Sequence, residues 1–122
     1  MNILSKILTI LVSIEFIYIM FLQTFQTVSK NTSRIFKIPK GTMNNNFTKI
    51  LMKNQGIYNG LIGIILLYGA FIAPHPKEII IPILIYAIMV AIYGAMTSQK
   101  MIIIKQGLLP IINLLIIIIS KG

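Results

Sequence analysis

The sequence contains no cysteine and a single histidine, His75. Neither a disulfide nor a thiolate metal site is therefore possible, and a histidine-rich metal centre is not indicated. Charged residues are also scarce, at 11% of the 122 residues, whereas 57% of the residues are hydrophobic. A soluble domain of this size could not cover so much apolar surface with so few charges, so a lipid bilayer is the solvent that fits.

Four apolar segments are long enough to cross a membrane as helices. At about 1.5 Å per residue, roughly 20 residues cover a hydrocarbon core about 30 Å thick. The first segment is too long for a signal peptide, and no A-x-A-like cleavage site follows it. Short links between the later segments predict antiparallel neighbours. We therefore expect a single-domain, all-α membrane protein covering residues 1–122, an antiparallel bundle of four transmembrane helices at residues 3–25, 55–73, 79–97 and 101–120.

A basic loop, residues 26–53, separates the first two spans. Its basic residues are Lys30, Arg34, Lys37, Lys40, Lys49 and Lys53. Phe47, Ile50 and Leu51 recur at helical spacing, which predicts a short interfacial helix leading into the second span. The net charge of +9 is explained by membrane topology and by contact with anionic lipid rather than by nucleic-acid binding.

Prolines mark where the helices are expected to stop or bend. Pro74 and Pro76 end the second span, because proline cannot continue the hydrogen-bond ladder of a helix. Pro82 is expected in the first turn of the third span, where a missing N–H costs little. Pro110 lies inside the fourth span and predicts a kink there.

The basic residues are divided unequally between the two sides of the membrane. With four spans, the termini and the second loop share one side, which carries Lys6, Lys77 and Lys121. The other side carries the six basic residues of the first loop together with Lys100 and Lys105. The positive-inside rule therefore places the first and third loops in the cytoplasm and both termini outside the cell membrane of a bacterium.

Glu15 lies near the middle of the first span. A charge at that depth costs about 2.5–3.5 kcal/mol on insertion scales, so the side chain is expected to face the bundle interior or to be protonated. Polar side chains of the other spans fall in the cytoplasmic half of the bundle in the predicted orientation. We expect a polar pocket there, which would bind or help to transport a lipophilic or cationic small molecule with Glu15 as counter-ion. The candidate ligand-binding residues are Glu15, Tyr18, Gln23, Gln55, Tyr58, Asn59, Tyr93, Gln106 and Asn113.

A structural interpretation of the same residues stays open. Hydrogen bonds between amide side chains of membrane helices often only hold a bundle together, at about 0.6–2 kcal/mol each. Small residues spaced by four allow close helix approach, and this packing role is assigned to Gly56, Gly60, Gly63, Gly94 and Gly107. The alternative function is therefore a structural or accessory protein that supports membrane integrity or a membrane complex. An unpaired glycine-rich face would also allow a homo-oligomer.

The sequence shows no catalytic constellation. It has no Ser-His-Asp set, no glycine loop that could cradle a phosphate, and no metal-ligand spacing. Binding is therefore favoured over catalysis, and a carboxylate-assisted reaction on a lipophilic substrate is the enzymatic alternative. We expect no cofactor, no metal and no nucleic-acid partner; the expected partners are membrane lipids, the small ligand and a second copy of the chain.

Four short motifs follow one another along the chain. They are EFIYI at residues 15–19, NQGIYNG at 54–60, IYGAMT at 92–97 and QGLLP at 106–110. Together they resemble domain-of-unknown-function family 1304, a group of small bacterial membrane proteins, over nearly the whole chain. The resemblance implies the four-helix fold and the membrane location, but no activity or substrate. That family usually has histidine at the position of Phe16 and often an acidic residue at the position of Gln23. If the family's site is a Glu-His or two-carboxylate arrangement, this chain has only the glutamate, Glu15, of that site.

Overall fold

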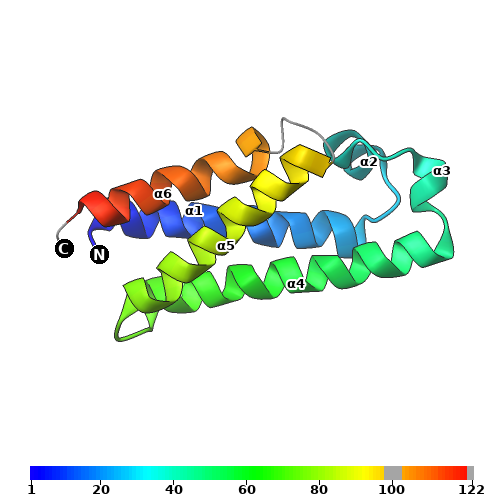
Figure 1. The fold of residues 1–122 in the computed structure, drawn as a ribbon. Helices are drawn as coiled ribbons and strands as arrows, with labels where there is room; N and C mark the ends of the chain where they lie inside the picture. The colour runs from blue at the N-terminus through cyan, green and yellow to red at the C-terminus, as the bar shows by residue number, and fades with distance from the viewer. Residues whose placement is uncertain (98–102, 121–122) are drawn as a thin grey trace. The chain divides into compact units, whose positions relative to one another are not determined.

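The computed structural model describes residues 1–97 and 103–120, and the regular elements in these ranges are all helical. The all-α class is therefore confirmed. The predicted link at residues 98–100 and Lys121 lie outside the described residues. In chain order the elements are α1 (Ile3–Met20), the π-helical η1 (Phe21–Phe25), α2 (Lys30–Phe36), α3 (Lys40–Met43), α4 (Asn46–Phe71), α5 (Pro76–Thr97), the π-helical η2 (Ile103–Gly107) and α6 (Leu108–Ile119) (Figure 1).

Three helices of the described chain are long and apolar enough to cross a membrane. They are Ile3–Phe25, which joins α1 and η1, then α4 and α5. The apolar helix α6 has 12 residues and follows η2 directly. This set of helices is compatible with a multi-pass membrane protein.

Helix α4 is longer than the predicted second span, because the expected interfacial helix and that span form one continuous helix. The side-chain oxygen of Asn45 caps its start by accepting from the N–H groups of Phe47 at 3.0 Å and Thr48 at 3.3 Å. Its 26 residues extend about 39 Å at 1.5 Å per residue, which exceeds a hydrocarbon core of about 30 Å.

Helix α5 begins earlier than predicted, at Pro76. Proline at the first helical position and Glu78 in the first turn both favour a helix start. Pro82 consequently lies inside the helix, beyond its first turn, so the prediction for Pro82 is wrong. Because Pro82 has no N–H, the carbonyl of Glu78 loses its usual helical donor.

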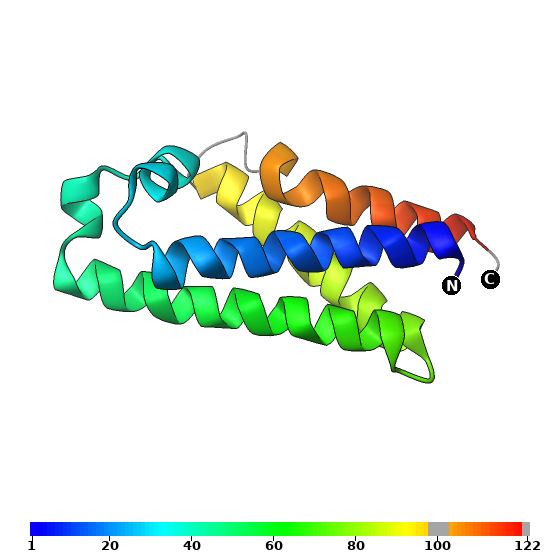
Figure 2. The same cartoon turned by 180° about the vertical axis from the view of Figure 1, so that it is seen from behind.

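The chain divides into two compact units, which are described separately. The first comprises Met1–Glu15 and Ile64–Gly122, and the second comprises Phe16–Gly63. In the first unit α5 packs against η2 and α6, and the start of α1 lies beside the end of α6 (Figures 1 and 2). There the amide of Asn2 donates to Ser120 Oγ at 3.1 Å. In the second unit α2 packs against η1 and α3.

Candidate functional site

The carbonyl groups that end the first span are satisfied by hydroxyl side chains of the second unit. Thr27 Oγ1 donates to the carbonyl of Gln23 at 2.6 Å. Thr32 Oγ1, from α2, lies 2.6 Å from the carbonyl of Gln26 and 3.3 Å from that of Leu22. An unsatisfied backbone group costs several kcal/mol in a membrane. The hydroxyl residues that follow this span therefore allow it to end in a wide π-helical turn.

Thr24 and Lys53 join η1 to α4 by two hydrogen bonds. Thr24 Oγ1 donates to the Lys53 carbonyl at 2.9 Å, and Lys53 Nζ donates to the Thr24 carbonyl at 3.2 Å. A cation at the carboxyl end of a helix is also favoured by the helix dipole. Gly56 permits this approach, since a Cβ at Gly56 would overlap the Thr24 hydroxyl and lie 3.0 Å from the Thr24 backbone nitrogen.

Gln23 and Asn59 are brought together in the same unit. Asn59 Nδ2 donates to Gln23 Oε1 at 2.8 Å, and Gln23 is only 8% exposed. The buried Gly60 lies next to Asn59 on α4, and a Cβ there would overlap the Met20 sulfur. Two candidate ligand-binding residues thus meet as an amide pair at a close helix contact.

Four other candidates lie on exposed surface. Tyr18, Tyr58 and Tyr93 are 48%, 69% and 68% exposed, and Gln55 is exposed as well. Gln55 and Tyr58 therefore point away from the buried face of α4 that carries Gly56 and Gly60. Tyr93 lines a shallow apolar groove of about 310 Å³ along α5 with Met89, Ile92 and Met96. Tyr93 belongs to the first unit, whereas Tyr18, Gln55 and Tyr58 belong to the second.

Asn113 pairs with a buried stripe of small polar residues on α1 in the first unit. Ser5, Thr9 and Ser13, each four residues apart, are fully buried, as is Asn113. The Asn113 amide lies 3.0 Å from Thr9 Oγ1, which itself lies 2.8 Å from the Ser5 carbonyl oxygen. In the amide orientation that satisfies both of its polar atoms, the side-chain oxygen accepts from Thr9 Oγ1 at 3.0 Å and from the Thr9 N–H at 3.3 Å, and the nitrogen donates to the Ser5 carbonyl at 3.3 Å.

Sequence reasoning identified Asn113 but missed the stripe of Ser5, Thr9 and Ser13. The available signal was their spacing of four residues, since small residues at this spacing allow membrane helices to approach closely. Ser5 Oγ is buried and has no hydrogen-bond partner among the described residues. The stripe is therefore a polar seam between α1 and α6.

Glu15 is half-buried in α1, and its carboxylate has no hydrogen bond or ion pair within the described part of the chain.

Gln106 is half-buried in η2, next to the buried Gly107. A Cβ at Gly107 would lie 3.1 Å from Ala91 Cβ, so α5 approaches η2 closely. Pro110 lies one turn after Gln106 and cannot donate to its carbonyl, which accounts for the wider π-helical turn ahead of it.

The remaining glycine candidates differ in their surroundings. Gly63 is buried and Gly94 is half-buried. Both Gln23 and Gln106 lie in π-helical segments, and such segments often occur at functional sites.

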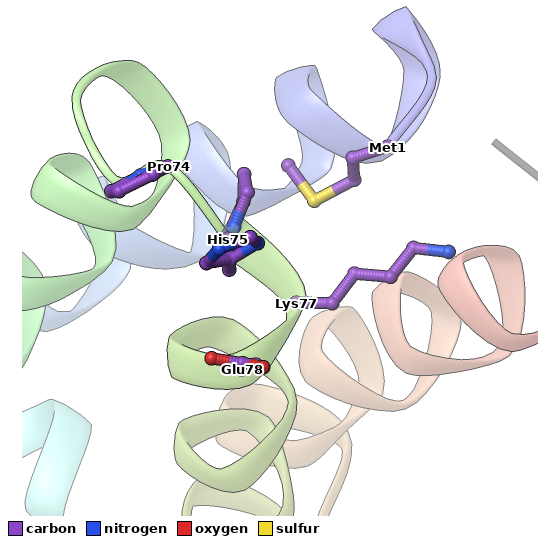
Figure 3. A pocket seen from close by; sticks show the side chains of 6 residues that line it. Met1, Pro74, His75, Lys77 and Glu78 are labelled. Carbon is purple, nitrogen blue, oxygen red and sulfur yellow. The ribbon is translucent and has the colours of Figure 1, made fainter.

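An open hollow of about 340 Å³ lies where α4 turns into α5. Its lining consists of Met1, Pro74, His75, Pro76, Lys77 and Glu78. The Lys77 side chain extends away from Glu78 (Figure 3). Nearby, Lys6 Nζ lies 4.8 Å from the centroid of the Phe71 ring. Among the described residues, no three His, Asp or Glu side chains gather closely enough to hold a metal ion.

Comparisons with known proteins place the chain in a family. The family model described as "Protein of unknown function (DUF1304)" matches residues 10–118. A similar protein is "Uncharacterized protein YpaA" of Lactococcus lactis subsp. lactis (strain IL1403), which is 50% identical over 115 residues, covering 94% of this chain and 97% of the relative. No solved structure matches at a significant level. The chain therefore belongs to family DUF1304, as its four motifs indicated.

Proposed function

We propose that this protein is a four-span protein of the cell membrane that binds, or helps to transport, a lipophilic or cationic small molecule. The observation that carries the proposal is Glu15. Its carboxylate lies midway along Ile3–Phe25 without a hydrogen bond or ion pair from the described residues. A carboxyl group at that depth needs a proton, a cation or a polar ligand as partner. We assign Glu15 the role of counter-charge for a ligand.

The proposed fourth span consists of η2 and α6, which follow one another without a break. With four spans, the charge distribution supports a cytoplasmic first loop and termini outside the cell. The membrane-crossing order is then outside to inside for Ile3–Phe25 and the reverse for α4.

Single cysteines test this orientation directly, because the chain has none of its own. A cysteine at Asn2 is expected to react with a membrane-impermeant maleimide in intact cells. A cysteine at Thr42, an exposed residue of α3, is expected to react only after the membrane is permeabilised. The reverse labelling pattern would contradict the proposed orientation.

Glu15→Gln is the variant that tests the proposed ligand site. It keeps the size of the side chain but removes the charge, so binding of the lipophilic cation tetraphenylphosphonium to protein in nanodiscs should weaken at least tenfold. An ion pair at 4 Å is worth about 4 kcal/mol at an effective dielectric constant of 20, which is enough to account for a tenfold loss of affinity. Equilibrium dialysis measures the effect.

The matched control is Glu78→Gln, which removes the only other acidic side chain. Glu78 is exposed in the first turn of α5, so its loss should change cation binding less than twofold. Equal binding by the parent and Glu15→Gln would refute the assignment of Glu15.

A structural or accessory role is the second candidate, and two observations favour it. The Gln23–Asn59 and Thr9–Asn113 pairs are satisfied by each other within their units. Interhelical bonds of this kind stabilise a membrane protein without any ligand. The absence of thermal stabilisation across lipids, quinones and organic cations would support this role over ligand binding, and crosslinking would test a homo-oligomer.

A further inference from the structure

Two cations lie on one face of the short helix α2, and a third follows at its end. Lys30 and Arg34 are exposed and four residues apart, a spacing that shares a helix face. Lys37 is exposed as well and ends the helix as its C-cap, in a left-handed conformation with a φ of 54°. On the other side, Thr32 is fully buried and Phe36 is half-buried. The basic loop is therefore an ordered amphipathic element in this region.

Helix α2 is fixed to the end of the first span. Ser29 caps it by accepting from the N–H of Thr32 at 3.1 Å. Thr32 in turn donates to the carbonyls of Leu22 and Gln26, and Leu22 belongs to the span Ile3–Phe25. These bonds hold α2 against the carboxyl end of a helix that is long enough to cross a membrane. Where that helix spans a bilayer, its end lies at the bilayer surface, whose field reaches about 8 Å at physiological salt.

The second unit offers these cations no acidic partner. Residues 16–63 contain no aspartate and no glutamate. Arg34 Nη2 donates to the uncharged Asn31 Oδ1 at 2.9 Å. Lys40, at the start of α3, is exposed as well, and the fully buried Met43 anchors that helix. Positive charge on this surface is therefore uncompensated within the unit.

We infer that α2 and the start of α3 form a docking surface for the headgroup phosphates of anionic phospholipids. Arg34 can bind a phosphate through two N–H groups, and Lys30 and Lys37 add point charges. A topology signal requires only that basic residues lie somewhere in the loop. It does not require two of them on one face of a helix, with a third at the C-cap, where that helix is hydrogen-bonded to the end of a span. This binding is separate from the ligand proposed at Glu15.

The test measures how strongly spin-labelled phosphatidylglycerol is preferred over spin-labelled phosphatidylcholine at the surface of the reconstituted full-length protein. Each cation near an anionic surface contributes about fivefold, which corresponds to about 1 kcal/mol. Lys30→Gln/Arg34→Gln should therefore reduce the preference at least fivefold. Lys6→Gln/Lys77→Gln removes the same charge from the first unit and should reduce it less than twofold.

An equal reduction in both double variants would overturn the inference, because net charge alone would then explain it. An unchanged preference in Lys30→Gln/Arg34→Gln would overturn it as well. Should that variant fail to reconstitute, the parent at increasing salt decides the question. Headgroup binding requires the preference to fall steeply with ionic strength, and a preference that does not change with salt would refute it.

Discussion

Replacing Gly56 with alanine is expected to destabilise the protein by about 1–3 kcal/mol, although alanine is the better helix former by about 1 kcal/mol. The new Cβ would overlap the Thr24 hydroxyl and lie 3.0 Å from the Thr24 nitrogen and 3.1 Å from Gln23 Cβ. The Thr24 backbone nitrogen cannot rotate away from the new Cβ as a flexible side chain could, so η1 and α4 must move apart. Both Thr24–Lys53 hydrogen bonds then lengthen or break. The midpoint of thermal unfolding in detergent measures the loss.

Two other glycines provide matched controls. Gly41 lies in α3 with no atom within 4 Å of its added Cβ, so Gly41→Ala should be neutral or stabilising by up to about 1 kcal/mol. At Gly60 the overlapping group is the flexible side chain of Met20, so Gly60→Ala should cost less than Gly56→Ala. An unfolding midpoint for Gly56→Ala at or above that of Gly41→Ala would show that η1 and α4 are not in close contact.

Thr9→Val is expected to destabilise the protein more than Thr9→Val combined with Asn113→Leu. Valine has the shape of threonine but no hydroxyl, so the 3.0 Å hydrogen bond between Thr9 Oγ1 and the Asn113 amide is lost in either orientation of that amide. A buried polar group left without a partner costs about 1–3 kcal/mol, whereas replacing both partners by apolar groups is close to neutral. Titration with a denaturing detergent gives the free energies of unfolding. We expect a coupling energy of about 0.6–2 kcal/mol.

Thr97→Val controls for the bond that Thr9 makes within its own helix. Thr97 Oγ1 donates to the Tyr93 carbonyl at 2.8 Å, as Thr9 Oγ1 does to the Ser5 carbonyl, but Thr97 is exposed. Its replacement should change the free energy of unfolding by less than about 0.5 kcal/mol. Free energies for Thr9 and Asn113 that simply add would argue against the polar seam between α1 and α6.

Hydropathy predicted which segments are helical better than it predicted where helices begin. Long apolar runs determine Ile3–Phe25 and α5, because hydropathy averages over about 20 residues. The start of α4 at Asn46 depends instead on a local cap from Asn45, and the polar residues before Gln55 lower the average without breaking the helix. The family assignment from four short motifs is confirmed.

The candidate site was harder to predict, because its geometry depends on which helices are neighbours. Gln23 and Asn59 could be proposed to lie close together, since both lie near the same predicted membrane boundary. Tyr58, adjacent to Asn59, is largely exposed. Its position in the sequence does not indicate whether its ring faces the bundle interior or the surface. The π-helical turn of η1 also shifts the helix face relative to regular α-helical spacing, so a helical wheel misplaces residues beyond Phe21.

The length of α4 has a consequence for the surrounding lipid. Its 26 residues extend about 39 Å at 1.5 Å per residue, whereas a hydrocarbon core is about 30 Å thick. A membrane-spanning helix with such an excess tilts, extends beyond the core or thickens the bilayer beside it, each at a fraction of a kcal/mol per ångström. Bilayer thickness would then bias where in a membrane of mixed composition this protein accumulates.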